Sequence, residues 1–247
     1  MTLPQRVALF SFIFPVVIIT ICYYLSWQGG HVDLCNPYIT GCEAITATVI
    51  YYAAAYVFRG LIIAYVSFGL WWYCAGAWLQ SVRGEPLKRW VKNMVWVGMS
   101  ATVMAVASLA VLGENMVPKA EHRDLWRFHV ITASLFFLIT SVCQILMAYR
   151  MNQLKHQLDI KDWSIRLKVA LGVVQLIMLM AFVTIHLLGL KASGVEEIFE
   201  WWLATFCAIF FLTGFWDWKD FRLTRLEKTQ AKQPSLDADA EFQGVQS

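Results

Sequence analysis

Six apolar stretches, each about as long as a lipid bilayer is thick, dominate this sequence. They cover residues 7–27, 48–79, 93–112, 128–149, 168–190 and 200–218. A helix needs roughly 20 apolar residues to cross the hydrocarbon core of a membrane. Inside lipid every backbone polar group must be satisfied within the protein, and a helix achieves this within one segment. The sequence therefore predicts an all-α integral membrane protein, a six-transmembrane helix bundle.

The composition supports this class. Of 247 residues, 59% are hydrophobic and 15% are charged, whereas soluble domains carry about 25% charged residues. The first stretch is too long for the apolar region of a signal peptide, and no small-residue cleavage pattern follows it. We therefore expect residues 7–27 to remain as the first membrane span.

Positive charge is distributed unevenly between the two ends of the predicted bundle. Lys and Arg are concentrated in residues 83–92, 150–168 and 219–232, and Arg6 precedes the first span, whereas residues 28–47 contain neither. Because loops rich in Lys and Arg stay in the cytoplasm, we expect both termini to be cytoplasmic. This bias also accounts for the net charge of +3, so no nucleic-acid partner is needed.

Two regions follow from this layout. Residues 1–218 form the predicted six-transmembrane domain, and residues 219–247 form a cytoplasmic polar tail. The tail is rich in polar residues and lacks apolar periodicity, as is typical of disordered segments.

The first loop on the extracytoplasmic side reads "HVDLCNPYITGCEAIT", residues 31–46, and contains Cys35 and Cys42. The turn-forming residues between them allow a disulfide to close, and the extracytoplasmic side is oxidising. A metal site is the weaker alternative, since His31 with this pair leaves the fourth ligand missing. A redox site is also weaker, because the spacing is not C-x-x-C. We expect a disulfide-bonded cap and no metal.

Ionisable residues inside membrane spans are costly, and four of them fall toward the extracytoplasmic side. They are Arg59, His129, His186 and Glu200. Such residues commonly mark functional sites. One interpretation is a headgroup site, with Arg59 on a phosphate. Another is acid–base chemistry, with His129 or His186 as the base and Glu200 as its partner. A third is structural, with Arg59 and Glu200 forming an ion pair.

Several motifs, taken in order, resemble the Frag/DRAM/Sfk family of six-span membrane proteins. They are "NPYITGCEAIT" in the first outer loop, "YVFR" in the second span, "FHVITASLFFL" opening the fourth and "EEIFEWWLATFCAIFFLTGFWDWKDF" through the sixth. The residues that match the family pattern are Pro37, Ile39, Thr40, Arg59, His129, Glu200 and Trp201. The family pattern commonly has Ser where this chain has Thr40.

The resemblance implies lipid handling at the extracytoplasmic leaflet: binding, remodelling or leaflet distribution. We accordingly expect headgroup contacts from Arg59, Glu43, Thr40 and Trp201, a membrane lipid with an anionic headgroup as the partner, and no cofactor. The alternatives are a lipid acyltransferase or hydrolase that uses His129 or His186 with Glu200, and a scaffold that binds a protein through its cytoplasmic loops. The expected location is a bacterial inner membrane or a eukaryotic Golgi or plasma membrane.

Overall fold

A computed structural model of the chain describes residues 1–82, 87–117, 119–188 and 194–223. Within these ranges six helical segments are long and apolar enough to cross a membrane, and no strand is present. The predicted six-span, all-α class is therefore confirmed. The spans are α1 (Leu3–Gln28), α4 with α5 (Ala54–Arg59, Leu61–Gln80), α6 (Arg89–Ala110), α7 (Arg123–Gln153), α8 (Asp162–Leu187) and α9 with α10 (Val195–Leu212, Gly214–Asp217).

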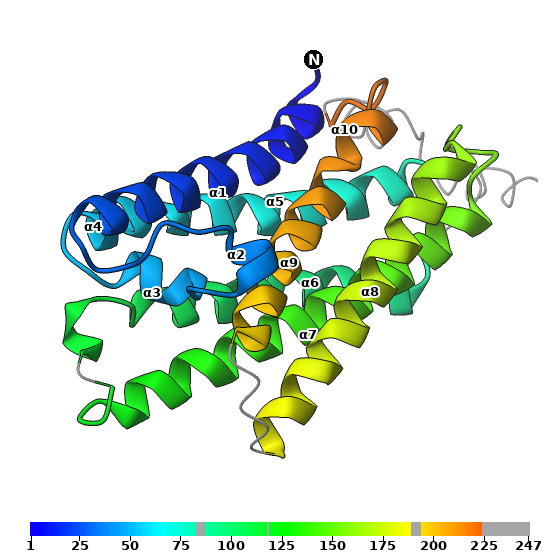
Figure 1. Cartoon of the computed structure of the whole chain (residues 1–247). Helices are drawn as coiled ribbons and strands as arrows, with labels where there is room; N and C mark the ends of the chain where they lie inside the picture. The colour runs from blue at the N-terminus through cyan, green and yellow to red at the C-terminus, as the bar shows by residue number, and fades with distance from the viewer. Residues whose placement is uncertain (83–86, 118, 189–193, 224–247) are drawn as a thin grey trace, which may run out of the picture.

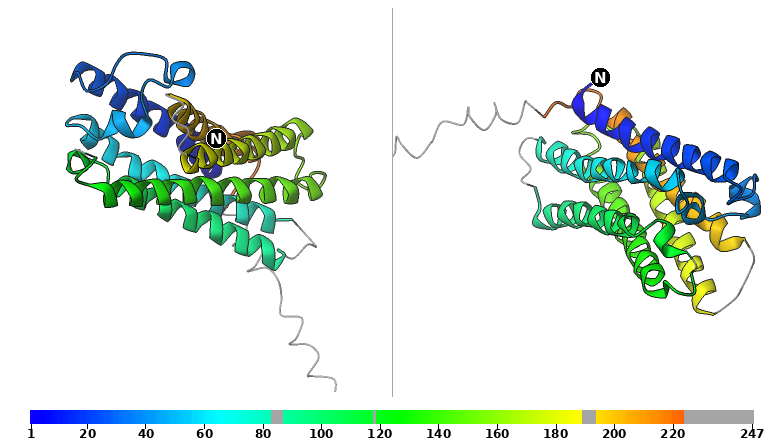
Figure 2. Two further views of the ribbon diagram at one scale, coloured as in Figure 1. Left: turned by 60° about the horizontal axis from the view of Figure 1, so that its bottom comes forward. Right: turned by 90° about the vertical axis from the view of Figure 1, so that its left-hand side faces the viewer.

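The helices pack mainly against their neighbours in sequence. α5 contacts α6, α6 contacts α7, α7 contacts α8 and α8 contacts α9, while α1 closes the bundle against α5 and α9. The right-hand view of Figure 2 shows α1, α5 and α6 side by side. We call the end that holds the N-terminus and α10 the inner end, following the orientation expected from the positive charge, and the opposite end the outer end.

Aromatic side chains fill the core toward the inner end. Trp71 and Trp72 of α5 are completely buried and pack against Phe211 of α9 and Trp218. The indole N–H of Trp71 donates to the Phe211 carbonyl oxygen at 2.8 Å. Lipid tails are as apolar as these side chains, so the hydrophobic effect does not drive membrane helices together. Close packing of this kind holds them together instead.

A buried ion pair joins α8 to α10 at the inner end. The Lys168 ammonium contacts the Asp217 carboxylate, and the two side chains are 0% and 3% exposed. Ser164 Oγ donates to the other Asp217 oxygen at 2.8 Å, and Lys168 Nζ donates to Ser164 Oγ at 2.7 Å. These contacts compensate both charges where the two side chains are almost completely buried.

The second span differs from its predicted course. Residues 48–79 were expected to form one helix, but the chain turns at residues 50–53, and Ala53 adopts a left-handed φ of 61°. The residues before the turn form a short separate helix, α3 (Ile45–Val49), and the span begins at Ala54. This break places α3 against the outer ends of α1 and α9 (Figure 1).

Residues 31–46 form a lid over the outer end of the bundle, and the predicted disulfide between Cys35 and Cys42 is present in it. The lid contains the short helix α2 (Pro37–Thr40), capped by the Asn36 side chain. Figure 1 shows α2 lying across α9, which it contacts. The predicted polar tail falls largely at residues 224–247, outside the described residues.

Candidate functional site

A cavity of about 320 Å³ lies near the outer end, lined by residues from α3 and from α5 through α9. This volume lies at the lower end of the range of small-molecule sites. Apolar side chains such as Leu179 and Phe137 form much of its wall, while Thr46, His129 and Glu200 supply polar groups. The cavity therefore offers both an apolar surface and a polar one to a single ligand.

A chain of hydrogen bonds connects the polar residues of this wall. Thr46 Oγ1 lies 3.1 Å from Glu200 Oε1 and 3.1 Å from His129 Nε2. On the other side of the ring, His129 Nδ1 lies 3.0 Å from the Ser108 carbonyl oxygen and 2.8 Å from Ser108 Oγ. One threonine of the short helix α3 thus joins a carboxyl group of α9 to an imidazole of α7.

The side chains of this chain differ in their exposure. Thr46, Ser108 and His129 are 5%, 3% and 8% exposed, whereas Glu200 is only partly buried and borders the cavity. Two more carboxylates, Glu196 and Glu197, line the same cavity one turn earlier on α9. Lys119, an exposed residue that also lines the cavity, places its ammonium 4.8 Å from the centre of the Trp126 ring.

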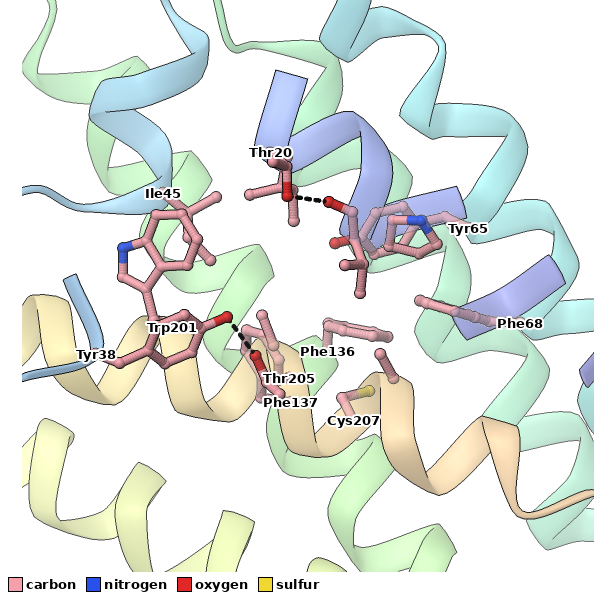
Figure 3. Close-up of a pocket in the computed structure, with 15 residues that line it drawn as sticks. Thr20, Tyr38, Ile45, Tyr65, Phe68, Phe136, Phe137, Trp201, Thr205 and Cys207 are labelled. Carbon is pink, nitrogen blue, oxygen red and sulfur yellow. Dashed lines mark hydrogen bonds between the residues drawn. The ribbon is translucent and has the colours of Figure 1, made fainter. Parts of the chain in front are cut away.

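A smaller cavity of about 60 Å³ adjoins the first and shares residues such as Ile45 and Phe137 with it. Figure 3 shows Tyr38 and Trp201 on one side of it and Phe68 on the other, with the Tyr38 hydroxyl bonded to Thr205 Oγ1 at 2.9 Å. Aromatic and aliphatic groups form most of its lining. The smaller cavity extends the apolar surface of the larger one toward the bundle core.

Two tryptophans of α9 attach the lid by hydrogen bonds from their indole N–H groups to backbone carbonyl oxygens of the lid. The indole N–H of Trp201 donates to the Glu43 carbonyl oxygen at 2.8 Å, and that of Trp202 donates to the Tyr38 carbonyl oxygen at 3.2 Å. Gly41 and Gly194 meet backbone to backbone, both with left-handed φ values, and a Cβ at Gly41 would overlap the Gly194 carbonyl group. Only glycine satisfies both the conformation and the contact at position 41.

The structure brings together some of the predicted site residues. His129 and Glu200 meet through Thr46, as described above. Trp201 is 6% exposed and borders the smaller cavity, where it holds the lid. His186 lies in α8, but its side chain is outside the described part of the structure.

Other predicted residues lie apart from the cavity. Arg59 is exposed, does not line it, and places its guanidinium 4.9 Å from the centre of the Tyr56 ring. Thr40 is exposed and donates within its own turn to the Asn36 carbonyl oxygen. Glu43 is partly buried in the lid, and this burial raises the pKa of its carboxyl group, assisted by the nearby charges of Asp33 and Glu197.

Three residues of the site were not predicted. Thr46 and Ser108 are small hydroxyl residues of a kind that often only bond within their own helix, and Lys119 lies outside any predicted span. The Asn-Pro turn, which lies between the two bonded cysteines, does indicate that the chain reverses before Thr46. It does not indicate which helix Thr46 meets. Among the described residues, no group of three His, Cys, Asp or Glu side chains is placed to hold a metal ion.

Comparison with known proteins identifies the family. The model of the Frag1/DRAM/Sfk1/Cwh43P N-terminal domain matches residues 5–221, which include all six spans and the lid. Searches of curated proteins and of solved structures find no significant match. The chain is therefore a multi-pass integral membrane protein that belongs to the Frag1/DRAM/Sfk1 family.

Proposed function

We propose that this protein binds a membrane lipid in the cavity at its outer end, with the headgroup at the polar wall and an acyl chain on the apolar wall. The observation that carries this proposal is the cavity itself, which combines Leu and Phe side chains with the bonded polar groups of Thr46, His129 and Glu200. A lipid presents the same two kinds of surface. Burying polar side chains at membrane depth costs free energy, so such residues commonly belong to a functional site.

The charged groups of the described residues that line the cavity, three carboxyl groups and one ammonium group, suit a headgroup that carries an amine or a hydroxyl as well as a phosphate. Lys119 is the ammonium group among the described lining residues, and it can contact a phosphate in place of Arg59. The carboxyl groups of Glu196, Glu197 and Glu200 can accept hydrogen bonds from a hydroxyl or amine. Arg59, which lies outside this cavity, has no part in this proposal.

A second candidate function is acyl transfer or hydrolysis on the bound lipid. The observation that favours it is the connection of a carboxyl group to an imidazole through Thr46, since such pairs perform general acid–base catalysis. A lipid product that forms in the presence of the wild-type protein, and not with Glu200→Gln, distinguishes this candidate from binding alone.

Native mass spectrometry of the protein purified in mild detergent tests the binding proposal. Ala133 lines the cavity, so Ala133→Phe fills part of it, whereas Ile131, on the same helix, is 58% exposed on the outside. We expect Ala133→Phe to weaken lipid binding by about tenfold in Kd, which corresponds to about 1.4 kcal/mol, and so to lower the fraction of protein with bound lipid. Ile131→Phe adds the same ring facing away from the cavity and leaves the fraction unchanged.

Arg59→Ala distinguishes lipid binding in this cavity from lipid binding at the headgroup site that the sequence predicted around Arg59. We expect it to retain lipid, because Arg59 does not line the cavity. The proposal is contradicted if no specific lipid co-purifies with the wild-type protein, or if Ala133→Phe and Ile131→Phe retain it equally.

A further inference from the structure

We propose that Glu200, Thr46 and His129 share one mobile proton, so that Glu200 can give a proton to, or take one from, a hydroxyl or amine group in the cavity. Thr46 acts as a positioning residue that conducts this proton between the cavity wall and the buried imidazole. The identity of the ligand rests on the lipid-binding function proposed above, whereas the relay itself rests on the hydrogen bonds of the protein.

The first step of the argument concerns the tautomer of His129. The Ser108 carbonyl oxygen, 3.0 Å from Nδ1, can only accept a hydrogen bond, so Nδ1 must carry a proton. Ser108 Oγ also lies 2.8 Å from Nδ1 and can accept from it while its own hydroxyl donates to the His129 carbonyl oxygen at 3.2 Å. Ser108 thus fixes the ring so that Nε2 faces Thr46.

The second step concerns the number of protons between Glu200 and His129. Thr46 has one hydroxyl proton and two partners, Glu200 Oε1 and His129 Nε2, each at 3.1 Å. Thr46 can donate to only one of them, so the other contact is a hydrogen bond only if that partner donates to Thr46. Both contacts are therefore hydrogen bonds when Glu200 and His129 Nε2 together hold one proton: the partner that holds it donates to Thr46, and Thr46 donates its hydroxyl proton to the other partner.

This proton has two possible places. In one arrangement the Glu200 carboxyl group donates to Thr46 Oγ1, and Thr46 donates to Nε2 of a neutral imidazole. In the other, the imidazolium donates from Nε2 to Thr46 Oγ1, and Thr46 donates to the Glu200 carboxylate. The first becomes the second when the carboxyl proton moves to Thr46 Oγ1 while the hydroxyl proton of Thr46 moves to Nε2. One O–H bond forms, one N–H bond forms, two O–H bonds break, and the total charge is unchanged.

The surroundings of the relay suit this exchange. Thr46 and His129 are only 5% and 8% exposed, and both line the cavity together with the more exposed Glu200. The other ionisable groups that line the cavity are Glu196 and Glu197 on α9, Lys119 before α7 and the Tyr65 hydroxyl on α5. Because His129 holds the proton when Glu200 does not, Glu200 can change its protonation state without a proton from the membrane surroundings.

Infrared spectroscopy of the full-length protein in nanodiscs tests the relay, with difference spectra taken between the wild-type protein and its variants. The carbonyl stretch of a protonated carboxyl group is assigned to Glu200 by its loss in Glu200→Gln. We expect His129→Gln to change the intensity of this band in the wild-type background, because the imidazole shares its proton. In Thr46→Val, which keeps the shape of the side chain but lacks the hydroxyl, His129→Gln leaves the band unchanged. Thr46→Ser restores the dependence.

A ligand arm uses nanodiscs of defined lipid. Phosphatidylethanolamine and phosphatidylglycerol carry exchangeable protons on an amine or hydroxyl group, whereas the quaternary ammonium of phosphatidylcholine carries none. We expect the Glu200 band to respond to at least one of the first two and not to phosphatidylcholine, and to lose this response in Thr46→Val.

The outcomes separate the two proposals. The relay is overturned if His129→Gln leaves the Glu200 band unchanged in the wild-type background, or if the effect survives in Thr46→Val. A protein that binds no lipid but shows the coupled band contradicts the proposed function and supports the relay. A protein that binds lipid but shows no effect of His129→Gln on the Glu200 band contradicts the relay and supports the proposed function. The elution volume and melting temperature of each variant establish that it is folded.

Discussion

Lys168 and Asp217 bury two opposite charges between α8 and α10, with Ser164 bonded to both. Two opposite charges are tolerated in a low-dielectric site only as long as both are present, because each compensates the cost of removing the other from water. The pair also connects the start of α8 to the end of the last span, two segments that approach one another at the inner end.

We predict that Lys168→Met destabilises the protein by about 3–5 kcal/mol, since it leaves the Asp217 carboxylate buried and uncompensated. The double variant Lys168→Met/Asp217→Leu should recover most of this loss, because apolar groups of similar size replace the whole pair. Denaturant unfolding in detergent measures both. Equal stability losses in the single and double variants would show that the packing, and not the stranded charge, is responsible.

At the same scale, the sequence indicated only part of the site. His129 and Glu200 could be selected as candidate site residues, because an ionisable residue inside a membrane span is costly and commonly functional. Arg59 met the same criterion, yet its side chain is exposed and lies outside the cavity. Thr46 met no criterion, since a threonine carries no charge and its importance comes from two partners distant in sequence.

At the scale of elements, the lid is held to α9 by Trp201, Trp202 and the contact between Gly41 and Gly194. Its C-terminal end continues directly into α3, which carries Thr46. The position of the lid therefore determines the position of the hydroxyl group that joins His129 to Glu200.

We predict that Gly41→Ala displaces the lid and that Gly30→Ala does not. Both glycines have a left-handed φ, so both substitutions incur the same backbone strain of about 1–2 kcal/mol. A Cβ at Gly41 would also collide with Gly194, whereas none of the surrounding atoms lies within 4 Å of a Cβ at Gly30. Hydrogen–deuterium exchange over residues 31–46 should increase only in Gly41→Ala. Equal exchange in the two variants would contradict the importance of the Gly41–Gly194 contact.

The elements themselves were largely predictable, for a physical reason. Apolar runs of span length determine where helices form, because lipid leaves the backbone no other partner. The break before Ala54 was not predictable, since residues 48–58 are as apolar as the rest of their run and contain no Pro or Gly. It accompanies the packing of α3 against α1 and α9, which are distant from α3 in sequence or separated from it by the lid.

At the scale of the whole molecule, the orientation in the membrane still rests on the distribution of Lys and Arg. Glu121 lies in the connection at the outer end and Gln157 in the connection at the inner end, and both are exposed. Their accessibility from the two sides of the membrane therefore reports the orientation directly.

We predict that a membrane-impermeant maleimide labels Glu121→Cys in intact cells and labels Gln157→Cys only after permeabilisation. Cys22, Cys74, Cys143 and Cys207 are buried and Cys35 is bonded to Cys42, so the background labelling should be low. The cysteine-intact parent chain provides the measure of that background. Labelling of Gln157→Cys from outside would reverse the topology and place the cavity in the cytoplasmic leaflet.

The docking of the lid on α9 has a consequence for biosynthesis. The lid follows the first span, and its disulfide joins cysteines only 7 positions apart, so the loop can close as soon as it emerges from the translocation machinery. The helix that receives it, α9, belongs to the sixth span. Chains are synthesised from the N-terminus, so the oxidised loop must wait while four further spans are inserted. The cavity is therefore completed only when α9 has been made, and a chain that stops short of α9 exposes the loop surface that α9 covers in the folded bundle.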